Sequence, residues 1–182
     1  MKSIILRTFR KAHVVGMFVL AVGLLATPVL IPSVGNAQDA RVAKTMAALK
    51  DQTTKLGPPP IDGIDEVGGR KNAPALFFGS TKMNNNFSVV DAVAKGGGRG
   101  TAATLFVKSG DDYIRIATNV STRIGRRGLG TILTGAALKS IKEGNPYYGK
   151  TSVLGTPYVS GYEPIKDASG ATIGVYFVGY KK

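Results

Sequence analysis

The sequence of 182 residues contains no cysteine. Disulfide bonds, thiol catalysis and cysteine-based metal sites are therefore excluded. Its single histidine, His13, lies close to the N-terminus, so residues 38–182 contain none. A domain without histidine lacks Ser-His-Asp triads, histidine metal clusters and the commonest general base. No other paired set of acid and base groups stands out, so we expect no catalytic residues, no metal and no cofactor.

Acidic residues are also scarce, with 11 Asp and Glu against 24 Lys and Arg. Four of the basic residues and none of the acids precede residue 38, which leaves 20 basic and 11 acidic residues, a net charge of +9, for residues 38–182. A positive field favours anionic ligands, nucleic acid or anionic membrane surfaces. The sequence has no nucleic-acid recognition motif, and its N-terminal residues have the pattern of an export signal, so we do not expect nucleic acid as a partner. The alternative is that the positive charge lies on the solvated surface and serves no specific partner.

The N-terminus has the three-part pattern of a secretory signal. A basic start precedes the uncharged stretch Val14–Ile31, and the small residues of Gly35-Asn36-Ala37 follow. The pattern predicts cleavage between Ala37 and Gln38 and a periplasmic protein. The alternative is an uncleaved anchor in the inner membrane, since about 18 apolar residues are near the lower limit for a spanning helix. No second stretch of that kind follows, so we expect no membrane-crossing transmitter in this sequence.

The clearest structural pattern is the C-terminal stretch from Gly161 to Tyr180. Tyr158, Ser160 and Tyr162 alternate with smaller or charged residues, and the same period of two recurs in residues 173–178. Residues 167–170 supply turn-forming side chains and a glycine. The pattern predicts an antiparallel hairpin.

Before this hairpin, Ala40–Leu56 has helical periodicity and ends at Gly57 and the run Pro58–Pro60. Residues 61–72 are polar and are predicted to be an irregular connection, followed by a strand over 75–79. Val89, Val90 and Val93 indicate a further short strand or a helical turn. Residues 95–100, KGGGRG, have the composition of a phosphate-binding loop without the Lys-Ser/Thr ending, and are predicted to be a turn.

A second hairpin is predicted from Thr101–Val107 and Tyr113–Val120, with its turn at residues 109–112. Alternation along the second strand places Tyr113, Arg115, Ala117 and Asn119 on one face. An arginine inside such a strand is either a solvated outer-face residue or an anion clamp, and the pattern leaves both open. Residues 129–141 read as a short helix and 151–154 as a strand. This order predicts an α+β fold with an antiparallel sheet.

The second half of the sequence resembles an extracellular sensor domain of the Cache 3/Cache 2 fusion type. The resemblance rests on an ordered series of segments between residues 77 and 182, namely 111–120, 125–131, 144–150, 154–155, 158, 162–165, 167, 170 and 173–180, with 78–79 and 100–104 as extensions upstream. We therefore divide the chain into a signal peptide at 1–37, a helix with a proline-rich end at 38–60, and a Cache-like domain at 61–182.

The resemblance implies a long helix followed by a PAS-like antiparallel sheet with a short inserted helix and a small-molecule pocket on one sheet face. It implies a sensory role of the kind found in chemotaxis and signal transduction, often with carboxylates or amino acids as ligands. Because this sequence has no signalling domain, a separate chemoreceptor or sensor kinase would have to relay the signal.

Arg115 is the first candidate for the ligand site, because a guanidinium presents a planar fork that matches a carboxylate. Arg127 is the second, with a salt bridge or a solvated loop as its alternative. Tyr148, Tyr158 and Tyr162 are candidates for an aromatic wall, and Lys150 for an additional charge. Ordinary sheet packing is the alternative for each tyrosine.

Three hypotheses follow. The first is a periplasmic sensory domain for a small anionic metabolite. The second is a structural or interaction domain without a small ligand, forming a homodimer through the helix at Ala40–Leu56. The third, an enzyme, is disfavoured by the missing histidine and cysteine.

Overall fold

The computed structural model describes residues 37–69 and 71–182. The predicted signal peptide, apart from Ala37, lies outside the described residues. The first described element is helix α1 (Ala37–Thr54), which ends before the glycine and prolines that the sequence marked as its stop. None of the helices in the described part of the chain is both long and apolar enough to cross a membrane.

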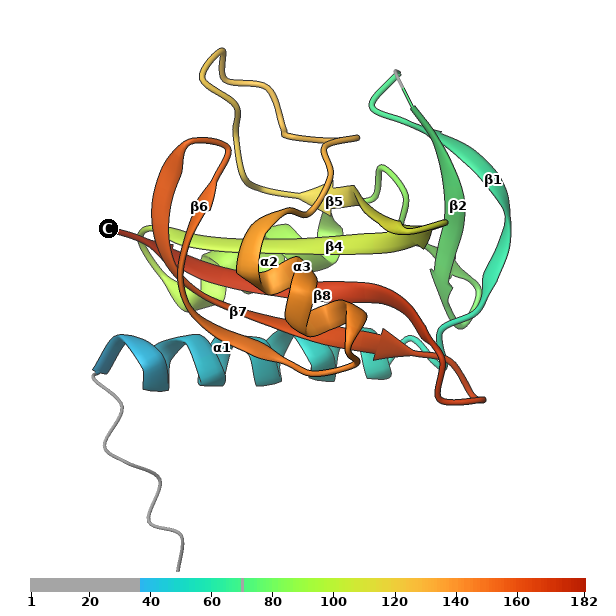
Figure 1. Cartoon of the computed structure of the whole chain (residues 1–182), viewed down its shortest axis with the longest axis horizontal. Helices are drawn as coiled ribbons and strands as arrows, with labels where there is room; N and C mark the ends of the chain where they lie inside the picture. Colours follow the sequence, from blue (N-terminus) through green and yellow to red (C-terminus); the bar gives the residue numbers. More distant parts are fainter. Residues whose placement is uncertain (1–36, 70) are drawn as a thin grey trace, which may run out of the picture. The chain divides into compact units, whose positions relative to one another are not determined.

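The main element is a five-stranded antiparallel sheet in the order β5-β4-β8-β7-β6 (Figure 1). Its strands are β4 (Thr101–Ser109), β5 (Asp112–Thr118), β6 (Tyr147–Val153), β7 (Thr156–Lys166) and β8 (Thr172–Lys181). The predicted C-terminal hairpin is confirmed as β7 and β8. Its turn is closed by Asp167, whose Oδ1 accepts hydrogen bonds from the backbone N–H groups of Ser169 and Ala171 at 2.9 and 3.0 Å.

Each face of this sheet has its own buried cluster. On one face, α1 buries Val42, Met46 and Leu49 against the sheet, and helix α2 (Ser88–Gly97) adds its three valines. On the other face, helix α3 (Gly135–Lys142) packs against aromatic residues of β7 and β8. The α+β class and the antiparallel sheet predicted from the sequence are thus confirmed. Both clusters draw only on residues between 42 and 180.

The prediction of an irregular connection at residues 61–72 is wrong. Strand β1 (Ile61–Val67) pairs antiparallel with β2 (Lys71–Phe78), and a two-residue β3 (Thr81–Lys82) completes a second, three-stranded sheet. The strand was missed because most of β1 is exposed and its apolar residues Ile61, Ile64 and Val67 recur at every third position, so it lacks the apolar alternation of a half-buried strand.

The predicted helix at residues 129–141 begins too early. Helix α3 starts only at Gly135, because the backbone of residues 130–133 instead bonds to the edge of β5. Gly130 N–H donates to the carbonyl of Arg115, and Leu133 N–H donates to that of Tyr113, each at 2.9 Å. This pairing places an extended segment directly beside Arg115.

A β-bulge corrects the predicted face pattern of β5. Phe106 pairs with Arg115 and Leu105 with Ala117, so Ile116 is the extra residue. As a result Ala117 lies in the cluster beneath α1 and α2, together with Ile116, and not on the face of Arg115. Arg115 remains on the α3 side, above the ring of Phe106.

Candidate ligand-binding site

Arg115 is a buried arginine that has no counter-ion among the described residues. Its side chain is only 4% exposed, and its guanidinium carbon lies 4.9 Å from the centre of the Phe106 ring. One nitrogen, Nη1, donates to Thr131 Oγ1 and, at 3.4 Å, to the carbonyl of Gly128. Its buried Nε has no hydrogen-bond partner, and no ion pair joins Arg115 to a carboxylate among the described residues. Buried charges are normally paired, so this arrangement requires an explanation.

Burial lowers the pKa of Arg115 to about 10, because desolvation disfavours the charged form; the nearby hydroxyls of Tyr162 and Tyr158 oppose this shift. The pKa still lies well above 7, so the guanidinium carries its full charge at neutral pH. An anion entering this place would meet a cation in a low-dielectric setting, where attraction is stronger than in water.

Arg115 lines a cavity of about 390 Å³ on the α3 face of the sheet. The walls come from residues 132–134, from residues 152–155 at the β6–β7 turn, and from Tyr162. This volume is in the range of small-molecule sites. The cavity therefore combines one charged group with apolar and hydroxyl-bearing walls.

Tyr162 and Tyr158 form an aromatic layer behind this cavity. The ring of Tyr162 lies 4.8 Å from that of Phe177, and the ring of Tyr158 lies 6.3 Å from it in an edge-on arrangement. Burial raises the pKa of both tyrosines, so their hydroxyls are neutral at ordinary pH. They are hydrogen-bonding groups, not charges.

Two further residues close around Arg115 that the sequence did not single out. Leu154 has a φ of +50° in the β6–β7 turn, and its side chain packs against Gly128. A Cβ atom on Gly128 would lie 2.4 Å from Leu154 Cδ1 and 3.3 Å from Arg115 Nη1, so only glycine fits without a shift. The glycine-rich segment 125–130 was visible in the sequence, but its place beside Arg115 depends on pairing with β5.

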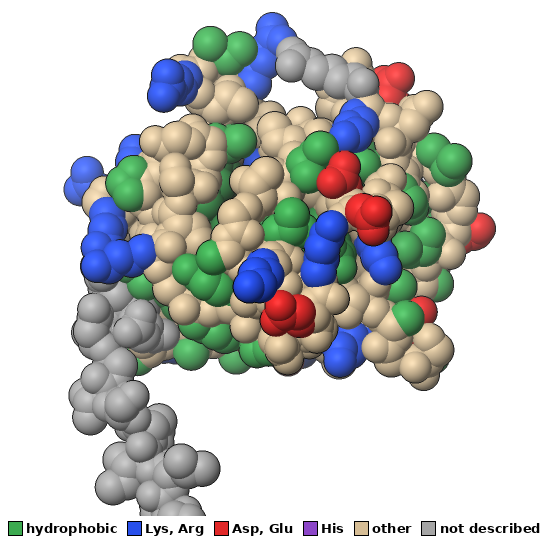
Figure 2. Space-filling model, in the orientation of Figure 1, with side chains coloured by type: hydrophobic (Ala, Val, Ile, Leu, Met, Phe, Trp, Pro, Cys, Tyr) green, Lys and Arg blue, Asp and Glu red, His purple; other side chains and the backbone are tan. Residues whose placement is uncertain are grey.

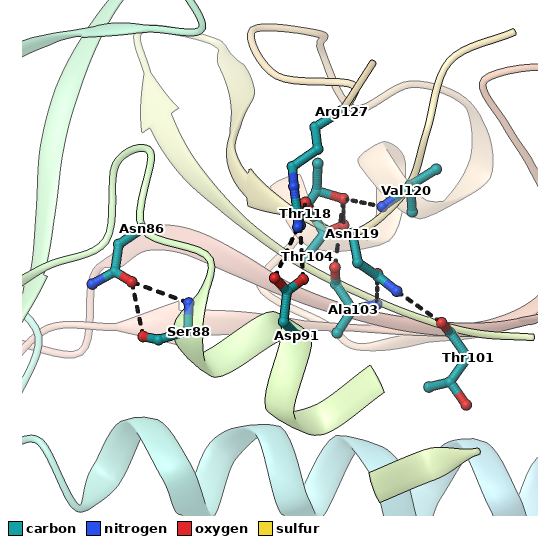
Figure 3. Close-up of polar contacts among 10 residues, drawn as sticks. All are labelled: Asn86, Ser88, Asp91, Thr101, Ala103, Thr104, Thr118, Asn119, Val120 and Arg127. Carbon is teal, nitrogen blue, oxygen red and sulfur yellow. Dashed lines mark hydrogen bonds and ion pairs between the residues drawn. The ribbon is translucent and has the colours of Figure 1, made fainter. Parts of the chain in front are cut away.

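Arg127 is engaged elsewhere. Its guanidinium forms a two-pronged ion pair with Asp91 of α2 at 2.7 and 2.8 Å (Figure 3). It also donates to the carbonyl of Thr118 at 2.6 Å and lies 4.2 Å from the centre of the Phe87 ring. Of the two alternatives that the sequence left open for Arg127, the salt bridge is the arrangement observed.

Tyr148 and Lys150 lie on the opposite face of β6. A Cβ atom on Gly161 would meet both the ring of Tyr148 and the side chain of Val42, which places Tyr148 on the α1 side. Its hydroxyl donates to Glu163, and burial together with this carboxylate raises its pKa. Lys150 is exposed and lies two residues after Tyr148 in β6, so it lies on the same side of the strand. The structure thus groups Arg115, Tyr158 and Tyr162 and separates Arg127, Tyr148 and Lys150 from them.

Comparison with known proteins places this geometry in a family. The family model described as Cache 3/Cache 2 fusion domain matches residues 64–182. The match extends the resemblance seen in the sequence upstream into β1 and includes every residue that lines the Arg115 cavity. No curated protein matches the chain.

Proposed function

Because the chain belongs to the Cache 3/Cache 2 fusion family, which is a family of extracellular sensory domains, we propose that it is a periplasmic sensor that binds a small carboxylate at Arg115. The observation that carries this proposal is the buried guanidinium with an unpartnered Nε beside a cavity of about 390 Å³. A carboxylate supplies both the missing charge and two acceptor oxygens.

The walls of the cavity define the rest of the ligand. The apolar side chains of Ile132, Leu133 and Val153 favour a short carbon skeleton, while Tyr162 offers a hydroxyl group. In this proposal the carboxylate binds Arg115 and the remainder of the molecule lies against residues 132–134 and 152–155. A separate membrane chemoreceptor or sensor kinase relays binding to the cell.

Calorimetric titration tests the ligand class. Residues 38–182 contain the whole core and are titrated with short monocarboxylates, dicarboxylates and α-amino acids. We expect one class to bind and to raise the melting temperature, since a ligand specific for the folded state stabilises it. Arg115→Met should weaken binding by at least thirtyfold, because truncating a buried charged partner costs about 2 kcal/mol or more.

Arg126→Met is the matched control, because this substitution removes the same charge from an exposed residue that lies outside the Arg115 cavity. We expect its affinity to stay within threefold of the unmodified protein. The proposal fails if no carboxylate of the panel binds, or if Arg115→Met binds as tightly as Arg126→Met.

A further inference from the structure

Six basic side chains gather at one end of the domain, where α1 begins. The topology explains their meeting, because α2 ends, β4 begins and β8 ends at this same place (Figure 1). Arg41 Nη2 donates to the carbonyls of Gly97 and Arg99 at 2.6 and 3.1 Å, and the backbone N–H of Lys181 donates to Gly100 at 3.0 Å. We refer to the following set as the basic end: Arg41, Lys44, Lys95, Arg99, Lys181 and Lys182.

The basic end consists of exposed side chains that take part in none of the described ion pairs. Acidic turns instead lie at the other end of the strands, with Asp111 between β4 and β5 and Asp167 between β7 and β8. Figure 2 shows Lys and Arg side chains collected at the left-hand end of the view, which is the end where Figure 1 draws the C-terminus. The carboxylates of these two turns therefore lie away from the basic end, and the exposed Lys108 and Lys166 accompany them there.

The same end follows directly after the apolar stretch of the sequence. Val14–Ile31 is uncharged and has the length of a segment that enters a membrane. From Ile31 to Ala37 the chain makes six residue steps, which span at most about 20 Å. While that stretch occupies a membrane, the basic end is therefore held close to the lipid surface. The tether lasts only until the predicted cleavage after Ala37, or permanently in the uncleaved alternative, and for that time it favours a membrane over nucleic acid as the partner.

We propose that the basic end docks on an anionic lipid surface. Lys and Arg side chains near such a surface each strengthen binding by roughly fivefold. The loop at residues 97–100 supplies no phosphate-binding fingerprint, so the attraction is one of charge and not of a specific headgroup. This inference is independent of the ligand at Arg115.

Vesicle cosedimentation tests the proposal with residues 38–182, which lack the apolar stretch and so cannot bind by inserting it. We expect binding to vesicles of 40% phosphatidylglycerol in phosphatidylcholine, no binding to pure phosphatidylcholine, and loss of binding at high salt. The triple variant Arg99→Glu, Lys181→Glu, Lys182→Glu should bind at least tenfold more weakly. Arg41 is kept because its guanidinium holds the loop at 97–99.

The control is Lys108→Glu, Lys142→Glu, Lys166→Glu, which changes the net charge equally at exposed positions away from the basic end. It should bind within threefold of the unmodified protein, and both variants should keep its circular dichroism spectrum. Failure of the unmodified protein to bind anionic vesicles overturns the proposal. So does an equal loss in the two variants, which would assign binding to net charge alone. Tighter binding to duplex DNA than to vesicles, lost in the first variant only, would assign the basic end to nucleic acid instead.

Discussion

Replacing Arg115 by methionine should make the protein more stable while abolishing carboxylate binding. The reason is that this charge is buried without a counter-ion in the part of the chain that the structure describes. Replacing buried ionic groups by apolar side chains of similar volume is often neutral or stabilising. A residue retained for structure would behave in the opposite way, so the sign of the change separates the two roles.

The magnitude follows from the pKa of Arg115, which burial lowers to about 10. This value lies well below the ordinary one, and each pKa unit corresponds to about 1.4 kcal/mol, so the charged form costs roughly 3 kcal/mol in the folded state. Since the folded pKa lies below the unfolded one, this cost is present in full at neutral pH and disappears only above about pH 12.

Methionine also gives up favourable contacts. The cation–π contact with Phe106 is worth about 0.5–1 kcal/mol, and the hydrogen bond to Thr131 about 1 kcal/mol. Thr131 is not orphaned, because its hydroxyl also donates to the carbonyl of Gly128 at 2.8 Å. The expected net gain is therefore about 1–2 kcal/mol, or roughly 3–8 °C in melting temperature for a domain of this size.

The assay is chemical and thermal unfolding of the ligand-free protein at pH 7, with Arg126→Met as the exposed control. The control should change the free energy of unfolding by less than about 0.5 kcal/mol. A loss of more than about 1 kcal/mol in Arg115→Met would refute the reasoning, because it would show that the chain itself already compensates the buried charge.

Three further predictions concern other parts of the molecule. Arg127→Ala should lower the free energy of unfolding by about 1–2 kcal/mol. A double-mutant cycle with Asp91→Ala should show a coupling energy of only about 1 kcal/mol, because both side chains are partly exposed and water screens their attraction. Additive effects of the two substitutions would contradict the ion pair. Burial tends to raise the pKa of Glu163, but hydrogen bonds from Lys50 and Tyr148 outweigh this effect and lower the pKa. The stability that this carboxylate contributes is therefore present above its unfolded pKa and is lost as pH falls through the folded pKa. NMR titration of Lys50→Met should show a higher pKa for Glu163 than in the unmodified protein. N-terminal sequencing of the exported protein should begin at Gln38, whereas an intact N-terminus in the membrane fraction would establish the uncleaved anchor.

Strands with a buried face were predictable, and strands without one were not. In β7 and β8 the period of two is strong because both faces are buried, so successive side chains enter the two buried clusters in turn. In β1 the same backbone pairing involves mostly exposed residues, and its apolar residues Ile61, Ile64 and Val67 are spaced by three, which leaves no alternating pattern in the sequence. The bulge at Ile116 left no signal either, because it depends on which residues of β4 stand opposite β5.

The position of a candidate site residue was predictable only where alternation within its own strand determined which face of the sheet it occupies. Arg115 lies in a strand whose neighbours Ile114 and Ile116 face the opposite core, so its own face could be deduced from local alternation. The side of Tyr148 could not, because Tyr147 and Tyr148 have opposite parity and only the register with Tyr162 decides between them. The partner of Arg127, Asp91, is 36 residues away and belongs to another element.

The contrast between these two arginines carries the functional argument further than either does alone. Arg127 and Arg115 lie twelve residues apart, and each has a carbonyl acceptor and an aromatic face. Among the described residues only Arg127 also has a carboxylate partner, although it is the more exposed of the two and its charge is better solvated by water. The five N–H donors of Arg115 meet one hydroxyl and one carbonyl, which fix its position without balancing its charge. A domain that neutralises its partly exposed arginine, and leaves its buried one beside a cavity without a described carboxylate, has the arrangement that the proposed anion site requires.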